Sequence, residues 1–241
     1  MNGYVDIHTH ILPGVDDGAA NIQEACLLVR MARDHGTKVL FLTPHYRGDH
    51  TEYSTEQLRE MFSQLQALVA EEMPDMQLCL GMEIRFSGEV PEKLQEGEIL
   101  SLNGSSFVLL EFSRQALRSQ ILLGVKEILR YGYTPIIAHA ERCDTFRRFP
   151  DLIDEVRNLG AYIQINADSI MGAHGFAVKR FSHKLLKSWK VHFVATDAHD
   201  SQMRPPLLNG CFLRVCKKYG QDYAAQVFFE NARQIVENEW Q

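Results

Sequence analysis

Seven short apolar runs, each ending in a polar residue, restrict the fold of this chain more than any other feature. The runs end at positions 8, 45, 83, 111, 139, 166 and 197, with helix-like segments between them. Strands that alternate with helices indicate βα units and a parallel sheet. Their spacing of roughly thirty residues favours a barrel over two domains, so we expect one TIM-like (β/α) domain over residues 1–241. The alternative, an open doubly wound sheet, usually has a glycine-rich turn after its first strand, which this sequence lacks.

Capping signals indicate where the helices between these runs begin and end. Asn21 and Glu24 have the spacing of a helix start, and Ser54 and Gln57 repeat it. Pro74 ends the long second helix. Further helices are expected over residues 119–131, in a segment that ends at residue 160, over 176–188, and as two helices after residue 205.

The first apolar run leads into two histidines that are one residue apart. Because side chains alternate along a strand, His8 and His10 should point the same way, and Asp6 should lie on that face as well. Two imidazoles at a strand end can form half of a metal site, although this spacing alone is only moderately specific. Asp197 and His199 repeat the spacing at the end of the last run.

Metal-ligand residue types also stand at most of the other strand ends. Barrel enzymes build their active sites at the carboxyl ends of the strands, so these side chains should meet at one mouth. A lone histidine or a strand-end glutamate has an ordinary structural explanation, whereas their joint placement indicates metal binding. The nine candidate ligands are His8, His10, Asp17, His45, Glu83, Glu111, His139, Asp197 and His199.

The chemistry of these ligands favours several divalent ions. Nitrogen and oxygen donors without a thiolate suit Mn²⁺, Fe²⁺ or Zn²⁺, and nine donors are too many for one ion. The four carboxylates contribute −4, and three divalent ions would add +6, which leaves the site at +2. A site of that charge attracts a phosphate ester, so the pattern indicates phosphoryl transfer at a polymetal centre.

Composition argues against several other functions. The formal net charge of −6 is unlike that of a nucleic-acid-binding protein. No apolar run approaches the roughly 18 residues that span a bilayer, and no signal-peptide pattern opens the chain, so membrane insertion is not expected. The odd number of cysteines, five, suits reduced thiols, and we expect a cytoplasmic protein.

Short motifs surround the candidate ligands: His8-Thr9-His10, Val15-Asp16-Asp17-Gly18, Thr43-Pro44-His45, Gly81-Met82-Glu83, Leu110-Glu111-Phe112, Ala138-His139-Ala140-Glu141-Arg142 and Thr196-Asp197-Ala198-His199. These motifs resemble those of the polymerase and histidinol phosphatase (PHP) superfamily. Their order and the chain length resemble its manganese-dependent bacterial tyrosine-protein phosphatases, which are linked to capsular and exopolysaccharide synthesis. The resemblance covers almost the whole chain and implies a distorted seven-stranded (β/α) barrel.

The same resemblance implies roles for individual residues. Arg142 and Arg204 match the arginines that hold the phosphate, and His199 joins them as a catalytic residue. Apart from the resemblance, Asp6 is expected to orient an imidazole without binding metal itself, and a buried structural carboxylate is the alternative. The implied reaction is hydrolysis of phosphotyrosine by a hydroxide that bridges Mn²⁺ ions, of which up to three are bound. The implied ligand sets are His8, His10, Glu83 and Asp197 for one ion, Glu83, Glu111 and His139 for a second, and Asp17, His45 and His199 for a third.

The partner that the resemblance implies is a phosphotyrosine protein, a cytoplasmic bacterial tyrosine kinase with a tyrosine-rich tail. No motif bears on oligomeric state. A small phosphate monoester such as histidinol phosphate is the alternative substrate, since other PHP members hydrolyse one. An amidohydrolase-like metal hydrolase is a further alternative, but it would usually carry a carboxylated lysine where this chain has Glu111. A degenerate barrel that serves as a scaffold would bind no metal.

Cys79 and Arg85 have the Cys-x5-Arg spacing of cysteine-dependent tyrosine phosphatases. That chemistry needs a thiolate in a loop of phosphate-facing amides at a helix start. Because Cys79 falls inside an expected strand and Glu83 lies within the spacing, we expect the match to be fortuitous. Arg47 is expected to be a solvated loop residue near the rim of the site.

Overall fold

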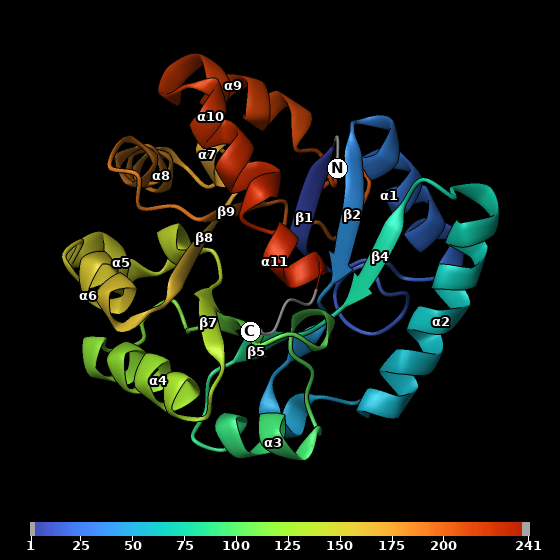
Figure 1. Cartoon of the computed structure of the whole chain (residues 1–241), viewed down its shortest axis with the longest axis horizontal. Coiled ribbons are helices and arrows are strands. Elements are labelled where there is room, and N and C mark those ends of the chain that lie inside the picture. The colour runs from blue at the N-terminus through green and yellow to red at the C-terminus, as the bar shows by residue number, and fades with distance from the viewer. Residues whose placement is uncertain (1–2, 238–241) are drawn as a thin grey trace.

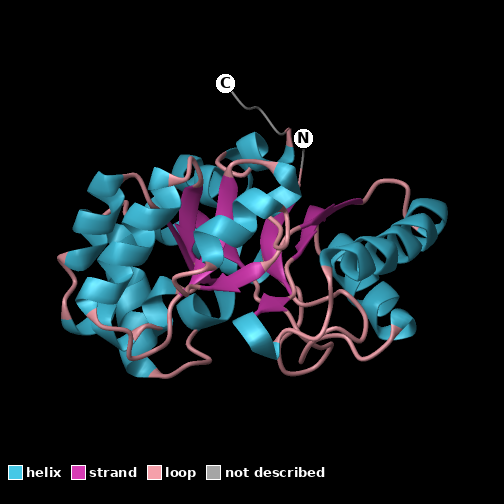
Figure 2. Ribbon diagram, turned by 90° about the horizontal axis from the view of Figure 1, so that it is seen from below, coloured by secondary structure: helices cyan, strands magenta, loops and turns pink. Residues whose placement is uncertain are grey.

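The computed structural model describes residues 3–237 and has a curled parallel sheet surrounded by helices (Figure 1). Helices flank the strands on both sides in the perpendicular view (Figure 2). The strands are β1 (Tyr4–Thr9), β2 (Thr37–Leu42), β3 (His45–Tyr46), β4 (Gln77–Leu80), β5 (Glu83–Arg85), β6 (Phe107–Glu111), β7 (Thr134–Ile137), β8 (Tyr162–Asn166) and β9 (Phe193–Ala195).

The strands form two hydrogen-bonded groups, β1-β2-β4 and β3-β5-β6-β7-β8-β9, and every pair is parallel. An isolated parallel bridge between Thr9 and Ala198 connects the end of β1 to the chain after β9. His10 donates its backbone N–H to the Ala198 carbonyl at 2.8 Å there. The sheet therefore curls until its first and last strands meet, as in barrel-like α/β folds.

Two of the seven expected runs are each split into two strands, so the structure has nine. The run at 39–43 stops at Pro44, which has no N–H to donate, and resumes as β3. The run at 78–82 breaks at Gly81, where an added Cβ would lie 2.7 Å from a side-chain carbon of Leu102. The breaks match each other, because Glu83 donates its backbone N–H to the Pro44 carbonyl at 3.0 Å. Each kink turns the chain just before the short strand that begins with a candidate ligand, His45 in β3 and Glu83 in β5.

Most of the expected helices and both predicted caps are present. Asn21 accepts from the Glu24 N–H, and Ser54 and Gln57 form a reciprocal capping box. The helix expected to end at residue 160 is two helices because Pro150 interrupts it. The helices are α1 (Ile22–Asp34), α2 (Thr55–Glu72), α3 (Val90–Glu96), α4 (Arg118–Arg130), α5 (Asp144–Arg148), α6 (Leu152–Leu159), α7 (Ala167–Met171), α8 (Phe176–Lys187), α9 (Asn209–Tyr219), α10 (Gln221–Ala225) and α11 (Arg233–Val236), with short turns η1 (Gly48–His50), η2 (Leu102–Gly104), η3 (Ala140–Arg142) and η4 (Gln226–Glu230).

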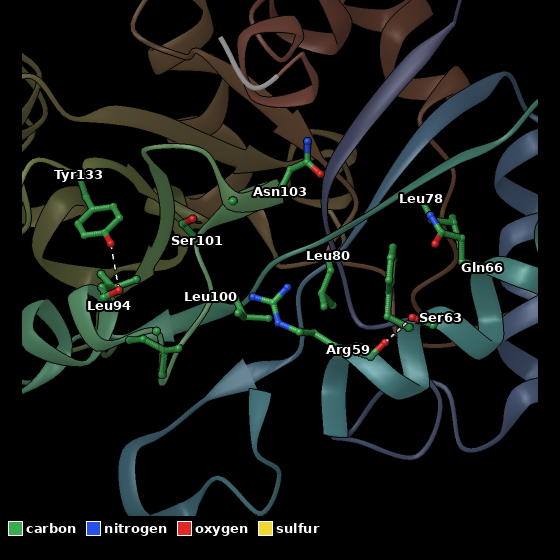
Figure 3. Close-up of a pocket in the computed structure, with 14 residues that line it drawn as sticks. Arg59, Ser63, Gln66, Leu78, Leu80, Leu94, Leu100, Ser101, Asn103 and Tyr133 are labelled. Atoms are coloured by element: carbon green, nitrogen blue, oxygen red, sulfur yellow. Dashed lines mark hydrogen bonds between the residues drawn. The ribbon is translucent and has the colours of Figure 1, made fainter. Parts of the chain in front are cut away.

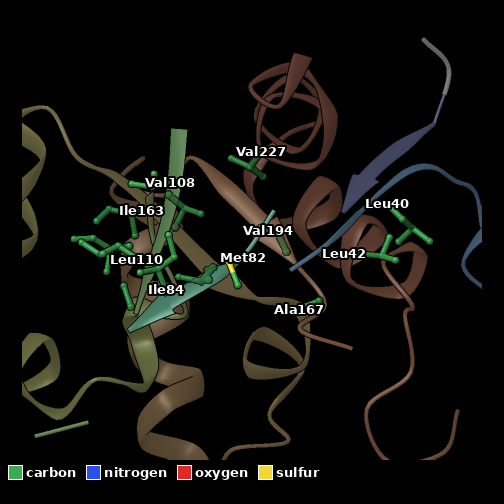
Figure 4. Packing of buried hydrophobic residues seen from close by; sticks show 14 of the residues in the cluster. Leu40, Leu42, Met82, Ile84, Val108, Leu110, Ile163, Ala167, Val194 and Val227 are labelled. Carbon is green, nitrogen blue, oxygen red and sulfur yellow. The ribbon is translucent and has the colours of Figure 1, made fainter. Parts of the chain in front are cut away.

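Apolar residues fill both faces of the sheet, as expected for parallel strands covered on both sides. One face packs against the surrounding helices, and Figure 4 shows part of this cluster, including Leu42, Leu110 and Val194. The opposite face forms a second cluster, which Ile235 and Val236 of the tail helix α11 join. Asn103 ties that helix down by donating to both of their carbonyls, at 3.3 and 3.1 Å. Within residues 3–237, no helix is both long and apolar enough to cross a membrane.

Candidate metal centre at the carboxyl ends of the strands

The end of β1 places His8 and His10 at the carboxyl ends of the strands. Its register with β2 shifts between Asp6 and Thr9, and such an irregularity re-aims the side chains that follow. Both histidines are completely buried. Asp6 lies against the backbone beside them: its carboxylate accepts the backbone N–H of Thr196 at 3.0 Å, the hydroxyl of the same residue and the backbone N–H of His8 at 3.4 Å. Within residues 3–237 it makes no hydrogen bond to an imidazole ring, so it acts as the alternative, a buried structural carboxylate that fixes the backbone at His8 and after β9.

Hydrogen bonds behind the two histidines determine which ring nitrogen carries a lone pair. Gln164 Oε1 accepts the backbone N–H of His139 at 2.7 Å, so it must also act as the acceptor for His8 Nδ1 at 3.3 Å. His10 Nδ1 lies 2.7 Å from the carboxylate of Asp16. Both Nδ1 atoms are therefore donors, and both Nε2 atoms are left as acceptors.

These two Nε2 atoms face each other at 3.2 Å, which two lone pairs tolerate only when a positive charge lies between them. Glu83 Oε2 lies 3.4 Å from both, and Asp197 Oδ1 lies 3.5 Å from His8 and 3.4 Å from His10. Burial lowers the pKa of His10, but Asp16, Asp197 and Glu83 outweigh it and raise the pKa well above its usual value. The cluster thus favours a cation here, either a proton or a metal ion.

Glu83 lies at the centre of the cluster. Its Oε1 is 2.6 Å from His139 Nε2, and its Oε2 is 2.8 Å from His45 Nδ1. Burial would raise the pKa of this carboxyl group, yet His8 and His139 hold it well below its ordinary value. Glu83 Oε2 and His45 Nδ1 are buried and make no hydrogen bond of acceptable geometry. Buried polar atoms without a hydrogen-bond partner fit a site in which they bind metal ions, with Glu83 as a bridging carboxylate.

All nine ligand candidates occur in groups whose donor atoms lie within 4.8 Å of one another. The groups differ from the expected sets: His10 joins the third set, and Glu83 is absent from the group of the first. Glu111 groups with His45, and His8 takes its place beside Glu83 and His139. The donor types and their overlap fit more than one divalent ion. The groups are His10, Asp17, His45 and His199; His8, His10 and Asp197; His8, Glu83 and His139; and His45, Glu83 and Glu111.

Two of the candidate ligands have a strained backbone. His139 has φ of 32° and Asp197 has φ of 55°, a region that residues other than glycine rarely adopt. Each such residue costs on the order of 1–3 kcal/mol, and strain of this kind is concentrated at functional sites. Each lies two residues beyond a strand end, His139 after β7 and Asp197 after β9, where the turn directs the side chain toward the cluster.

Three supporting residues received no role from the sequence. Asp16 accepts from His10 and also from the backbone N–H of His45 at 3.1 Å. The side-chain amide of Gln164 donates a hydrogen bond to Asn166 Oδ1 at 2.8 Å, and Asn166 donates in turn to Asp197 Oδ2 at 2.8 Å. Only their positions in the sequence could have indicated these roles: Asp16 is next to Asp17, and Gln164 and Asn166 belong to the sixth strand run.

The two arginines expected to hold phosphate converge on one carboxylate oxygen of the cluster. Arg142 Nη1 and Arg204 Nη2 lie 2.8 and 2.7 Å from Asp197 Oδ2. Both guanidinium groups remain partly exposed. Arg142 thus pairs with neither of its neighbours in sequence: Glu141 is buried and accepts the Asn166 N–H at 3.1 Å, and Asp144 pairs with another residue.

The Cys-x5-Arg match has no catalytic geometry. Cys79 lies in β4, and burial raises the pKa of its thiol to about 12. Arg85 instead forms two hydrogen bonds with Glu111, at 3.1 and 3.2 Å, and so helps to position that candidate ligand. The expectation that the spacing is fortuitous is confirmed.

A cavity of about 230 Å³ opens beside the third ligand group, lined by Asp16, Asp17 and His45 together with exposed Arg47 and His50. A larger cavity of about 600 Å³ lies elsewhere, where Arg59 and Gln66 of α2 face Leu80 and Leu100 (Figure 3). None of the nine ligands lines the larger cavity.

A curled α/β sheet with a buried histidine and carboxylate cluster at the carboxyl ends of its strands defines a barrel-like α/β protein with a candidate metal centre. The chain belongs to the family described as capsular polysaccharide synthesis, CpsB/CapC, whose model matches residues 4–237. It is 32% identical over 241 residues to the tyrosine-protein phosphatase CpsB of Streptococcus agalactiae serotype III (strain NEM316), covering 98% of this chain and 99% of that protein. It is 32% identical to the tyrosine-protein phosphatase YwqE of Bacillus subtilis (strain 168), covering 98% and 92%.

Solved structures agree with this assignment. One, described as YwqE from Bacillus subtilis and CpsB from Streptococcus pneumoniae, unique metal-dependent tyrosine phosphatases, matches with a TM-score of 0.89 at 33% identity, covering 98% of this chain and 95% of that one. Histidinol phosphate phosphatase from Lactococcus lactis matches with a TM-score of 0.62 at 16% identity, covering 90% and 94%. The second likeness concerns the fold alone.

Proposed function

We propose that this protein is a metal-dependent protein-tyrosine phosphatase that acts in polysaccharide synthesis. The observation that carries the proposal is the convergence of nine ligand-type side chains and two arginines on one buried cluster. Relatives of almost the same length that are named as tyrosine-protein phosphatases support it. Residues 1–241 form one domain in this proposal, and the nine strands occupy seven barrel positions, two of them split.

His8, His10, Glu83 and the other six candidates would hold divalent ions, for which Mn²⁺ is the proposed metal and three the proposed maximum. When bound, such ions supply positive charge at the phosphoryl oxygens and lower the pKa of water. The chain contributes Arg142 and Arg204, whose forked N–H donors match phosphate oxygens. In the structure both donate to Asp197, so they are already directed at the cluster before an anion arrives.

Phosphotyrosine is the proposed substrate because its leaving group is a phenol. The phenol has a pKa of about 10, and it departs far more readily than the alkoxide of serine or threonine. Two arginines and nine candidate metal ligands would stabilise the phosphoryl group, and this leaving group needs no separate acid in the proposal. The proposed protein substrate is a cytoplasmic bacterial tyrosine kinase with a tyrosine-rich tail.

The test combines elemental analysis of the purified protein with assays on phosphotyrosine, phosphoserine and histidinol phosphate. We expect bound divalent metal and a clear preference for phosphotyrosine. Equal turnover of phosphotyrosine and phosphoserine peptides would contradict this account of selectivity. Preferred hydrolysis of histidinol phosphate or of an amide would place the protein in another hydrolase class, and a protein that binds no metal would be a scaffold.

A further inference from the structure

A groove between α5 and α8 is separate from the metal-ligand cluster. Arg147, Pro150, Phe176, Arg180, Phe181 and Lys184 line it, and its volume is about 360 Å³. In Figure 1 α8 lies beside α5 and α6, at the edge of the molecule away from α1 and α2. We call this feature the α5–α8 groove.

The α5–α8 groove adjoins the turn that carries one of the phosphate-binding candidates. Helix α8 packs against η3, the turn Ala140–Arg142. Arg147, which lines the groove, donates to the Glu141 carbonyl at 2.7 Å, one residue before Arg142. One wall of the groove is therefore hydrogen-bonded to the turn that carries Arg142.

The entrance of the groove is aromatic and exposed. Phe176, the first residue of α8, is 78% exposed, whereas Phe181 forms a buried floor. An exposed ring beside a buried one provides an apolar surface that another chain could cover.

The groove is also positive, in a chain whose net charge is −6. Helix α8 contains Lys179, Arg180, Lys184 and Lys187 and no carboxylate. Lys184 and Lys187 suit the negative end of the helix dipole, but Arg180 lies in the first half of the helix, where that dipole does not favour a cation. Within residues 3–237, Arg180 and Lys184 form no ion pair.

Neighbouring carboxylates do not neutralise this charge. Asp144 is paired with Arg147, and Asp151 and Glu155 are both paired with Arg118. On the other side of α8, burial lowers the pKa of His183, and Lys218, Lys179 and Arg214 lower it further. The positive potential thus extends from the groove over α8 toward α9.

We propose that the α5–α8 groove binds an acidic stretch of the phosphoprotein substrate next to its phosphotyrosine. Carboxylates of the substrate pair with Arg180 and Lys184, and an apolar side chain of the same stretch covers Phe176. This inference rests on the proposed function. It adds a rule for substrate choice, because the groove selects the sequence around the phosphotyrosine while the cluster binds the phosphate.

The test compares two phosphotyrosine peptides that are identical except for glutamates or glutamines on both sides of the phosphotyrosine. Wild-type protein should have a kcat/KM about fivefold higher for the acidic peptide at low salt, as two exposed charge pairs provide. The preference should shrink as salt screens the charges. The double variant Arg180→Glu, Lys184→Glu should lose it, and its hydrolysis of p-nitrophenyl phosphate should stay unchanged.

A matched control is the double variant Arg59→Glu, Lys126→Glu, which has the same change in net charge on α2 and α4. Both of its positions are exposed, and neither lines the groove. The control should keep the preference for the acidic peptide.

The outcomes separate the inference from the function it rests on. Equal use of both peptides by the wild type, or an unchanged preference in the groove variant, would overturn the inference alone. A groove variant that keeps the peptide preference but loses binding to phosphatidylglycerol vesicles would assign the surface to a membrane and overturn it as well. Metal-loaded wild type that hydrolyses neither the peptides nor p-nitrophenyl phosphate would overturn both.

Discussion

Single residues behind the ligands decide what the cluster can bind. Asp16 accepts hydrogen bonds from His10 Nδ1 and from the backbone N–H of His45, and so directs His10 Nε2 toward the other candidate ligands. Partners of this kind typically contribute 10- to 100-fold to metal affinity. We expect Asp16→Asn to weaken metal binding by roughly tenfold or more, measured by titration of the metal-free protein. The exposed Asp144→Asn is the control, and equal affinities would show that Asp16 only shapes its loop.

The arginines can be tested separately from the metal. If Arg142 and Arg204 hold the phosphoryl group, replacing either with Ala should lower kcat/KM at least roughly tenfold, about 1.4 kcal/mol of transition-state stabilisation. Inhibition by inorganic phosphate should weaken in parallel, because product and substrate share the two groups. Arg118→Ala is the control, since Arg118 is paired on the surface with Asp151 and Glu155. Variants with normal kcat/KM and normal phosphate inhibition would leave anion binding to the metals alone.

The Cys79 thiol offers a direct test of whether the phosphatase is metal-dependent or cysteine-dependent. Because burial raises the pKa of Cys79 to about 12, almost no thiolate forms at neutral pH. Chelation should therefore abolish turnover, while Cys79→Ser should leave kcat within a few-fold of wild type. An inactive Cys79→Ser protein with normal metal content and normal melting would contradict the metal-dependent mechanism.

At the scale of the element, the strand ends were predictable and the way they bend was not. An apolar run that is followed by His45, Glu83 or His139 predicts both a strand and a candidate ligand. Buried strands need apolar residues, whereas metal binding needs histidines or carboxylates, so the change of residue type locates the strand end. Pro44 alone is enough to predict a break in its strand. Gly81 alone is not, because the break there depends on the close approach of Leu102, which is distant in sequence.

Alternation along β1 failed as a guide for the same reason. A strict period of two puts the Asp6 side chain on the face of the His8 ring. The register between β1 and β2 shifts after Asp6, however, and its carboxylate bonds to the His8 backbone N–H and to Thr196 instead of to a ring. Gln164 could not be assigned either, because its role depends on contacts with His8 and His139 from other strands. The residue pattern of a single strand thus predicts which side chains reach the carboxyl end of the sheet. Hydrogen-bond partners that lie on different strands can be identified only from the folded structure.

The pairing of β8 with the segment before β9 should depend on pH. His192 Nδ1 accepts the Ile163 N–H at 2.9 Å, which requires a neutral ring. Burial, and then Arg157, lowers the pKa of His192 to about 4, against about 6.5 for an unfolded histidine. Between these values the unfolded chain binds a proton that the folded chain does not, so stability falls as pH falls through this window.

The measurement is urea unfolding of metal-free protein at about pH 7.5 and about pH 5. His192→Asn keeps an acceptor in the same place and cannot titrate. Wild type should lose roughly 2 kcal/mol more than the variant between the two pH values. Identical losses would mean that His192 is as easily protonated in the folded chain as in the unfolded one.

On the scale of the whole molecule, the metal centre should also stabilise the fold, because its ligands come from both ends of the chain. His8 lies on β1, His10 directly follows it, and Asp197 follows β9, so ions bound between them would link the first and last strands. Ions that bind only the folded state add about 2.7 kcal/mol per site at a concentration one hundred times the Kd. For a chain of this size each kcal/mol raises Tm by about 2–4 °C.

We therefore expect EDTA to lower Tm by at least about 5 °C, and added Mn²⁺ to restore it. Thermal unfolding followed by circular dichroism measures this without any activity assay. Glu83→Gln should lose at least half of the metal-dependent shift, because Glu83 belongs to two of the four ligand groups. Glu127→Gln on α4, whose side chain pairs only with Arg130 among the described residues, should keep the full shift. A wild-type Tm that does not change with EDTA would mean that metal does not join the two ends of the chain, and the ligand sets would then have to be redrawn around one strand end at a time.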